Sequence, residues 1–238
     1  MKAFIYGIGL QFKLDIRSKT LLITCYAVPL LFFAIMGGIF TSLMPEAKNT
    51  LIQSMTVMGV SMGAFIGLPP SLVEIYGGPI KKMYKANGVP LYFGLVSTVL
   101  SAFLHLYIMS GIIFAAAQLM YGAVPPADLP LYFAFLSVFL AVSVSVGSVL
   151  GLLVKHQAKL TMLSQLIFLP SIMLSGIMFS ADLLPGFLVY MGKLFPASWG
   201  YMLLTDTGSR FWNLSALFVI FAASAAVCGI ILKKMQSR

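Results

Sequence analysis

The sequence predicts an all-α membrane protein with six transmembrane helices, an N-terminal interfacial helix, a short cytoplasmic helix after the second span and a re-entrant extracellular hairpin after the fifth. Its 238 residues are 60% hydrophobic and only 9% charged, with a mean hydropathy of +1.00, whereas about 25% of residues are charged in a soluble domain. Long uncharged runs alternate with short basic clusters along the whole chain. We therefore treat residues 1–238 as one membrane domain.

The basic clusters predict the orientation of the chain. Cytoplasmic loops retain an excess of Lys and Arg close to the ends of transmembrane spans. Twelve of the fifteen cations fall into four clusters, and we assign these clusters to the cytoplasm: Lys2, Lys13, Arg17 and Lys19; Lys81, Lys82 and Lys85; Lys155 and Lys159; Lys233, Lys234 and Arg238. With Asp15 and Glu74, the inner side has twelve cations and two acids. The outer side has three cations and four acids: Lys48, Lys193, Arg210, Glu46, Asp128, Asp182 and Asp206.

The first element, residues 1–19, is predicted to be a helix that lies in the membrane interface. Phe4, Ile8, Phe12 and Ile16 recur every four residues, and the basic residues lie elsewhere on the helical wheel. The alternative is a frayed basic tail.

Six uncharged runs are long enough to cross a hydrocarbon core, which takes about 20 helical residues. They are Leu21 to Leu43, Leu51 to Val73, Leu91 to Leu119, Leu131 to Val154, Leu160 to Phe179, and Phe211 to Leu232. An even number places both termini on one side, as the basic clusters at both ends also require. Pro170 removes a backbone hydrogen bond from the fifth span and should kink or break it.

Small and neutral polar residues are the main features within the spans. Gly59, Gly63 and Gly67 lie four apart, a spacing that lets membrane helices pack closely. The spans contain no Asp, Glu, Lys or Arg, which argues against ion-coupled transport. We take Gln53 and Gln165 as candidate pathway residues, and His105 as a hydrogen-bond partner between helices.

Between the second and third spans, the sequence predicts a two-turn helix from Pro79 to Ala86. Gly77-Gly78 ends the preceding helix, Pro79 suits a helix start, and Asn87-Gly88 followed by Pro90 ends the new helix. One face is apolar and the other basic: Ile80, Met83 and Tyr84 oppose Lys81, Lys82 and Lys85. The helix could dock a cytoplasmic partner, or its lysines could lie on anionic lipid headgroups.

After the fifth span, residues 180–208 predict a pair of short helices that dip into the outer leaflet and return. The segment is mostly apolar, but prolines and glycines prevent one continuous helix, and Asp182, Lys193 and Asp206 leave no room for a full crossing. Trp199 and Trp212 would lie near the interface.

Other chemistries receive little support. The cations are divided among membrane-flanking segments and form no soluble basic face, which excludes nucleic acid as a partner. No His, Cys or acidic cluster has metal-ligand spacing. Residues 59–63 match the G-x-S-x-G pattern of a serine hydrolase around Ser61, but a helix interior is not the strand-to-helix elbow which that motif needs. We therefore expect no catalytic residue.

Together these segments resemble a permease of the type-2 ATP-binding-cassette (ABC) exporters. The residues that carry the resemblance run from Glu74 to Pro90 and from Leu174 through Pro185 to Pro196. It implies that the short helix, with Glu74, Gly78, Ile80, Lys81, Lys82, Met83, Tyr84 and Lys85, couples the chain to a cytoplasmic ATPase, the three apolar side chains filling a groove in that partner.

The resemblance also implies a function and its partners. The chain would be a permease subunit in the plasma membrane of a bacterium, paired with a second or related permease and exporting an amphipathic or hydrophobic substrate such as a peptide, drug or lipid-like molecule. No phosphate-binding loop occurs in the sequence, so ATP and Mg²⁺ would bind the partner ATPase and no cofactor would bind this chain. The alternatives are a non-transporting partner, such as an immunity or sensor subunit, and an intramembrane serine hydrolase.

Overall fold

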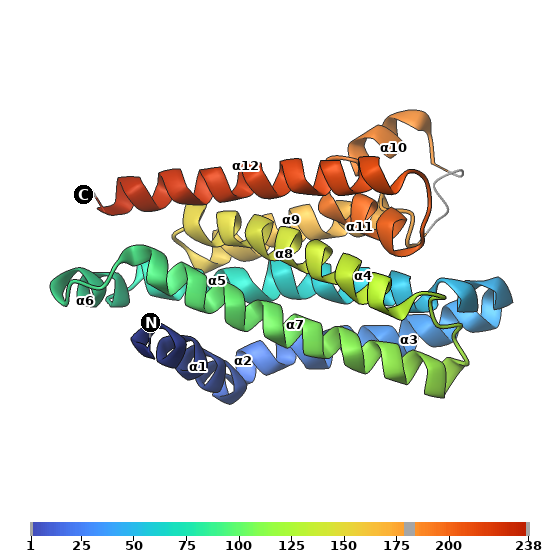
Figure 1. Cartoon of the computed structure of the whole chain (residues 1–238), viewed down its shortest axis with the longest axis horizontal. Coiled ribbons are helices and arrows are strands. Elements are labelled where there is room, and N and C mark those ends of the chain that lie inside the picture. The colour runs from blue at the N-terminus through green and yellow to red at the C-terminus, as the bar shows by residue number, and fades with distance from the viewer. Residues whose placement is uncertain (1, 179–183, 237–238) are drawn as a thin grey trace.

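The computed structural model is an elongated bundle of roughly antiparallel helices (Figure 1). It describes residues 2–178 and 184–236, with side chains described from Tyr6 onward. No strand occurs among these residues. The predicted positions of Phe4, Phe179, Asp182 and Arg238 therefore lie wholly or partly outside the described part.

Within the described residues, five helical stretches are long and apolar enough to cross a membrane: Lys19–Leu43, Leu51–Gly77, Leu91–Tyr121, Leu129–Leu153 and Arg210–Gln236. The first comprises α2 (Lys19–Leu22), the π-helical turn η1 (Ile23–Ala27) and α3 (Val28–Leu43); the second comprises α4 (Leu51–Met62), the π-helical turn η3 (Gly63–Gly67) and α5 (Leu68–Gly77). The others are α7 (Leu91–Tyr121), α8 (Leu129–Leu153) and α12 (Arg210–Gln236). They correspond to five of the six predicted spans.

The predicted fifth span is shorter than expected. Its helix, α9 (Gln157–Met173), has 17 residues and a length of about 26 Å, below the roughly 30 Å of a hydrocarbon core. Pro170 lies inside α9 and does not break it. The chain turns just after the helix instead, where Gly176 has a φ of +86° and Ser175 Oγ donates to the Ile172 carbonyl.

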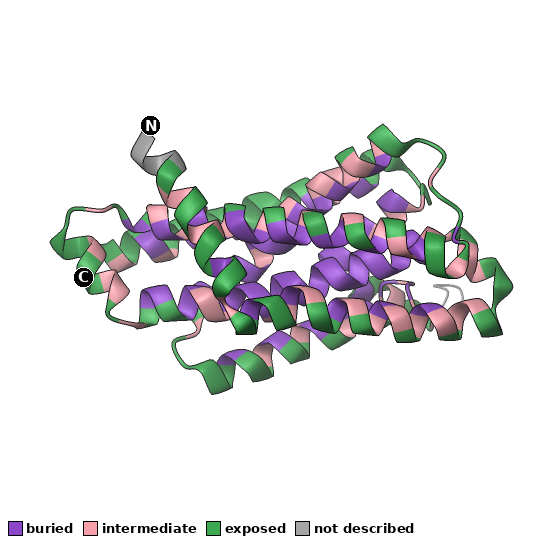
Figure 2. Ribbon diagram, turned by 90° about the horizontal axis from the view of Figure 1, so that it is seen from below, coloured by how far each residue is buried: buried purple, intermediate pink, exposed green. Residues whose placement is uncertain are grey.

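The stretch Leu51–Gly77 is the centre of the bundle. Of the 18 most apolar consecutive residues of this stretch, 94% are buried. The corresponding share for Arg210–Gln236 is 17%, so that stretch lies at the periphery. Figure 2 shows the buried residues concentrated along the axis. Both π-helical turns precede prolines, Pro29 in one case and Pro69-Pro70 in the other, and a missing amide hydrogen favours such a local widening.

Short helices complete the two ends of the bundle. The first helix, α1 (Lys2–Arg17), is followed by Ser18, whose Oγ accepts from Leu21 N to begin α2. The 3₁₀ turn η2 (Pro45–Asn49), α10 (Gly186–Gly192) and α11 (Pro196–Leu204) lie at the opposite end. The frayed-tail alternative for residues 1–19 is thus wrong, and two short helices are present within residues 180–208. The interfacial and re-entrant positions of these elements remain predictions.

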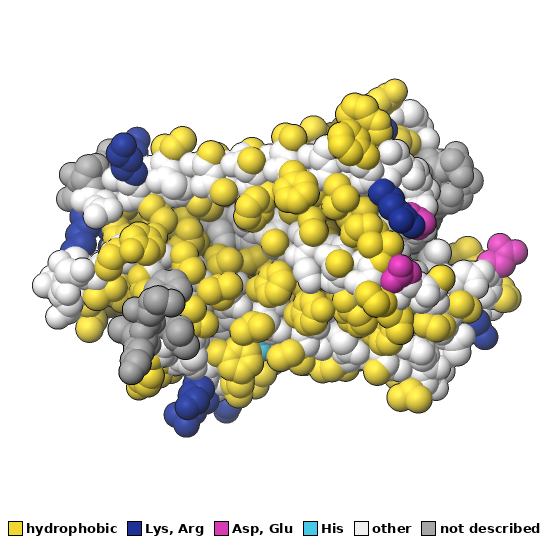
Figure 3. Space-filling model, in the orientation of Figure 1, with side chains coloured by type: hydrophobic (Ala, Val, Ile, Leu, Met, Phe, Trp, Pro, Cys, Tyr) yellow, Lys and Arg dark blue, Asp and Glu magenta, His cyan; other side chains and the backbone are white. Residues whose placement is uncertain are grey.

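The charges separate along the long axis of the bundle. Both termini and α6 (Ile80–Ala86) lie at one end, with Lys and Arg side chains around it, and most of the acidic side chains visible in Figure 3 lie at the other. We call the first the basic end. It contains all four cationic clusters as far as they are described, which is the arrangement that the sequence predicts for a cytoplasmic face.

Candidate functional site

The short helix α6 at the basic end forms as its sequence predicts. A Cβ added at Gly78 would lie 2.5 Å from the Glu74 carbonyl oxygen, so only glycine fits where the chain leaves α5. The Pro79 carbonyl accepts from the amides of Lys82 and Met83 and begins the helix. Asn87 Nδ2 donates to the Met83 carbonyl at 2.9 Å, and Gly88 reverses the chain with a φ of +66°.

The apolar face of α6 is divided between this chain and the surface. Ile80 and Tyr84 are half-buried and pack on the core of the bundle, whereas Met83 is 61% exposed. Of the three side chains that we expect to fill a partner's groove, Met83 is therefore the one that is exposed in this structure. The reason is the tight return at Val89, whose amide donates to the Tyr84 carbonyl and folds α6 back against α7.

Aromatic contacts fix α6 to its neighbouring helices. The Tyr84 ring lies 6.4 Å from the Phe93 ring, between ring centroids. A Cβ added at Gly94 would lie 2.8 Å from Cε2 of Tyr84. Tyr76 Oη, on α5, donates to the Leu91 carbonyl at 2.6 Å. Burial raises the pKa of Tyr84, so its hydroxyl stays neutral at physiological pH. Movement of α6 would consequently reach α7 through Tyr84, and α5 through the Tyr76 hydrogen bond to α7.

The lysines of α6 do not share one environment. Lys82 and Lys85 are exposed, and Lys85 Nζ donates to the Gln236 carbonyl at 3.4 Å, which links α6 to the end of α12. Lys81 is half-buried and faces a cavity between α8 and α12. Glu74 is exposed on α5, one turn before Gly78. The solvent-facing group on this helix is therefore Lys82, Met83 and Lys85, which we call the exposed face of α6.

The two candidate pathway residues lie in different environments. Gln53 is only 6% exposed inside α4, and its Oε1 has no hydrogen-bond partner. Gln165 is exposed on α9. Gln165 is therefore accessible at the surface of the bundle, whereas Gln53 is not.

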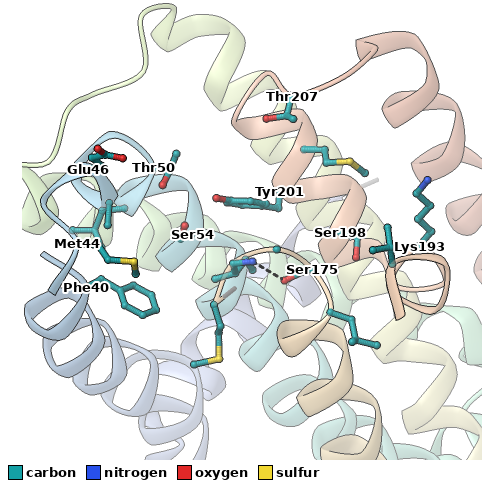
Figure 4. A pocket seen from close by; sticks show the side chains of 18 of the residues that line it. Phe40, Met44, Glu46, Thr50, Ser54, Ser175, Lys193, Ser198, Tyr201 and Thr207 are labelled. Carbon is teal, nitrogen blue, oxygen red and sulfur yellow. Dashed lines mark hydrogen bonds between the residues drawn. The ribbon is translucent and has the colours of Figure 1, made fainter. Parts of the chain in front are cut away.

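A cavity of about 770 Å³ opens at the end opposite α6 (Figure 4). Its walls come from the α3 to α4 connection, from the end of α9 and from α10 and α11. Glu46 and Thr50 lie on one side in Figure 4 and Lys193 and Ser198 on the other, with the Tyr201 ring between them. The remaining walls include Phe40, Met44, Leu174, Ile177 and Met178, so the cavity is amphipathic.

The glycines of the central helix contact α7 and η1 closely. A Cβ at Gly59 would lie 3.0 Å from Met109 Cε, and one at Gly67 would lie 2.7 Å from Cys25 Sγ. At Gly63 the added atom would overlap the Leu106 side chain. These positions let the central helix approach its neighbours more closely than any larger residue allows.

Sequence reasoning missed a buried acid on α1. Asp15 is 5% exposed, and its carboxylate accepts from Ser101 Oγ at 2.5 Å and from Gln11 Nε2 at 2.8 Å. One turn along α7, Tyr26 Oη and His105 Nδ1 are 2.7 Å apart, which confirms His105 as a bridge between helices. The available signal was the spacing, since Asp15 follows Phe12 by three residues and so lies on the apolar stripe.

Ser61, the centre of the hydrolase-like motif, has no catalytic surroundings. It is fully buried in α4, and its Oγ has no hydrogen-bond partner. His105 is engaged through Nδ1 by Tyr26. The motif therefore provides no activated nucleophile in this fold.

Comparison with known protein families identifies a family whose model matches most of the chain. The family model of the ABC-2 type transporter matches residues 4–208, which include α1 from its third residue and every element from α2 through α11. No curated protein sequence matches the chain.

Proposed function

The chain belongs to the ABC-2 type transporter family, and from this premise we propose that it is the permease subunit of an ATP-driven exporter. It is a multi-pass membrane protein and a transport component. We further propose that it couples to a separate cytoplasmic ATPase, that both termini are cytoplasmic, and that the membrane is a bacterial plasma membrane. The exposed face of α6 carries this proposal, because it offers a partner an apolar side chain between two cations on a helix fixed to the central bundle.

We assign ATP binding to the partner and transport to this chain on the basis of the sequence. No G-x-x-x-x-G-K-[ST] phosphate loop occurs among the 238 residues, so we assign ATP and Mg²⁺ to the partner. Tyr84 ties α6 to α7, the Tyr76 hydrogen bond ties α7 to α5, and α5 continues into the buried central helix. A displacement of α6 by the ATPase would thereby reach the middle of the bundle without passing through a flexible loop.

The amphipathic cavity opposite α6 supports an amphipathic or hydrophobic cargo, such as a peptide, a drug or a lipid-like molecule. Its apolar walls suit a hydrophobic body, while Glu46, Lys193 and the hydroxyls of Thr50 and Tyr201 suit a polar end. We propose that it lies on the exit side of the path. The exposed face of α9 that carries Gln165 is the surface where we expect a second or related permease.

The test is transport by the reconstituted pair. We would co-express the chain with the ATPase that copurifies with it, reconstitute both in proteoliposomes and measure ATP-dependent accumulation of an amphipathic fluorescent peptide. We expect accumulation with ATP and none with a non-hydrolysable analogue. Charge reversal at Lys82 and Lys85 should uncouple hydrolysis from accumulation, while the same reversal at Lys159, also basic and exposed, should not. Stable association without any accumulation would instead favour a non-transporting membrane partner.

A further inference from the structure

A second cavity, of about 420 Å³, lies at the basic end behind α6. Three segments far apart in the sequence form it: the junction of α5 and α6, the end of α8 with the loop that follows, and the last turns of α12. The segments are in close contact, because a Cβ added at Gly77 would lie 3.5 Å from the Lys155 carbonyl oxygen. The C-terminal end of α12 and α6 converge at the same end of the bundle in Figure 1.

Each of the three segments contributes one lysine to this cavity. Lys81, Lys155 and Lys234 line it, and no Asp or Glu of the described residues does so. Ammonium groups from three segments can donate charge-assisted hydrogen bonds to one anion bound in this cavity. We call these residues the lysine triad.

The other walls of the cavity are apolar and reach the outer surface of the bundle. Leu153 is 59% exposed and Ile230 is 67% exposed, and both line the cavity. At the membrane surface, such residues contact acyl chains and the neighbouring lysines contact headgroups. A small free anion would use the lysines and leave these walls to water. The combination instead suits a molecule with an anionic head and an apolar tail.

We propose that this cavity binds an anionic phospholipid of the membrane leaflet at the basic end. The phosphate is held between Lys81, Lys155 and Lys234, and an acyl chain runs along Leu153 and Ile230. The site requires that the chain lies in a membrane, but it does not depend on export or on an ATPase.

The lipid would bridge α6 to α8 and α12. One direct link already exists there, the hydrogen bond from Lys85 Nζ to the Gln236 carbonyl. A headgroup bound by lysines from all three segments adds a further link and opposes their separation. Lipid composition would then regulate how firmly α6 is held against α8 and α12. The lipid would act on the side of α6 opposite its exposed face.

The experiment measures lipid binding to the purified chain alone, in detergent. We would titrate short-chain phosphatidylglycerol, short-chain phosphatidylcholine and inorganic phosphate, following thermal unfolding and counting bound lipids by native mass spectrometry. We expect phosphatidylglycerol to bind and to raise the unfolding temperature, with phosphatidylcholine and phosphate far weaker. Equal binding of the two lipids would overturn the proposal. So would phosphate binding as tightly as phosphatidylglycerol, since the site would then accept a free anion.

Two exposed lysines of the triad allow a matched comparison of variants. Each removed lysine should weaken phosphatidylglycerol about fivefold, so Lys155→Gln with Lys234→Gln should weaken it about 25-fold. Both side chains are exposed, so the fold should tolerate the change, and Lys155→Arg should retain binding. Lys159→Gln is the control, since Lys159 is exposed four residues from Lys155 and does not line the cavity. A control that loses as much binding as the double variant would show non-specific attraction and refute the site.

Discussion

Truncation of Met83 to Ala should weaken binding of the partner ATPase without loosening the bundle. Full burial of a Met side chain stabilises by about 1.5–3 kcal/mol. The side chain is 61% exposed, so a partner that covers it completely gains about 1–2 kcal/mol. This corresponds to a roughly 5- to 30-fold increase in the dissociation constant. Ala is a good helix former, so α6 itself should persist.

The measurement is a titration of the ATPase against the permease held in lipid nanodiscs. Met162→Ala is the matched control, since Met162 is 65% exposed but lies on α9. We expect a weaker complex for Met83→Ala, an unchanged dissociation constant for Met162→Ala and unchanged thermal unfolding for both. A dissociation constant within twofold of the parent for Met83→Ala would refute the assignment of the exposed face of α6 as the docking surface.

Three further changes test the packing, the motif and the opposite end. Gly63→Val places atoms onto Leu106 and should cost about 1–3 kcal/mol in thermal unfolding, whereas Gly111→Ala, with open space around it, should cost nothing. Ser61→Ala should leave transport intact, because it removes a buried hydroxyl without a partner. Loss of transport in this variant would instead favour the alternative that the chain is a serine hydrolase. Arg210 lowers the pKa of Asp206 through a bidentate hydrogen bond, so this pair stabilises the structure above the ordinary aspartate pKa and ceases to do so as pH falls through the lowered value. Arg210→Gln should therefore remove the loss of stability at low pH that this pair causes, as measured by the unfolding temperature over a range of pH. The same pH dependence of the unfolding temperature in the variant and the parent would contradict the stabilising role of the pair.

The short helix α6 shows how far local signals extend. Gly78, Pro79 and the Asn87-Gly88 pair act on the backbone within a few residues, so its presence and both its ends could be predicted. Which of its side chains face a partner could not, because Tyr84 is held by Phe93 and Gly94 of α7. The fifth span shows the same limit of local signals. The apolar sequence continues past Met173, but α9 ends there and the chain turns at Gly176, which has a positive φ.

The buried carboxylate of Asp15 and the lysine triad have a common explanation. Periodicity assigns Asp15 to a helix face and the basic clusters to one side of the membrane, yet it says nothing about which helix packs against that face. Ser101 is 86 residues away from Asp15, and the lysines of the triad are separated by more than 70 residues each. Their proximity follows from close helix packing, which no local pattern encodes.

The sequence alone determined the all-helical membrane class, the distribution of charge between the two ends and the presence of α6, because hydropathy, charge and turn chemistry act over one turn to one span. Only the tertiary structure decided that the Leu51–Gly77 stretch is central, that Gln53 is buried and that Lys81 faces away from Lys82 into a cavity. Those outcomes depend on which helices lie side by side. In an apolar chain every helix offers a similar surface, so steric fit at positions such as Gly63 selects the neighbours.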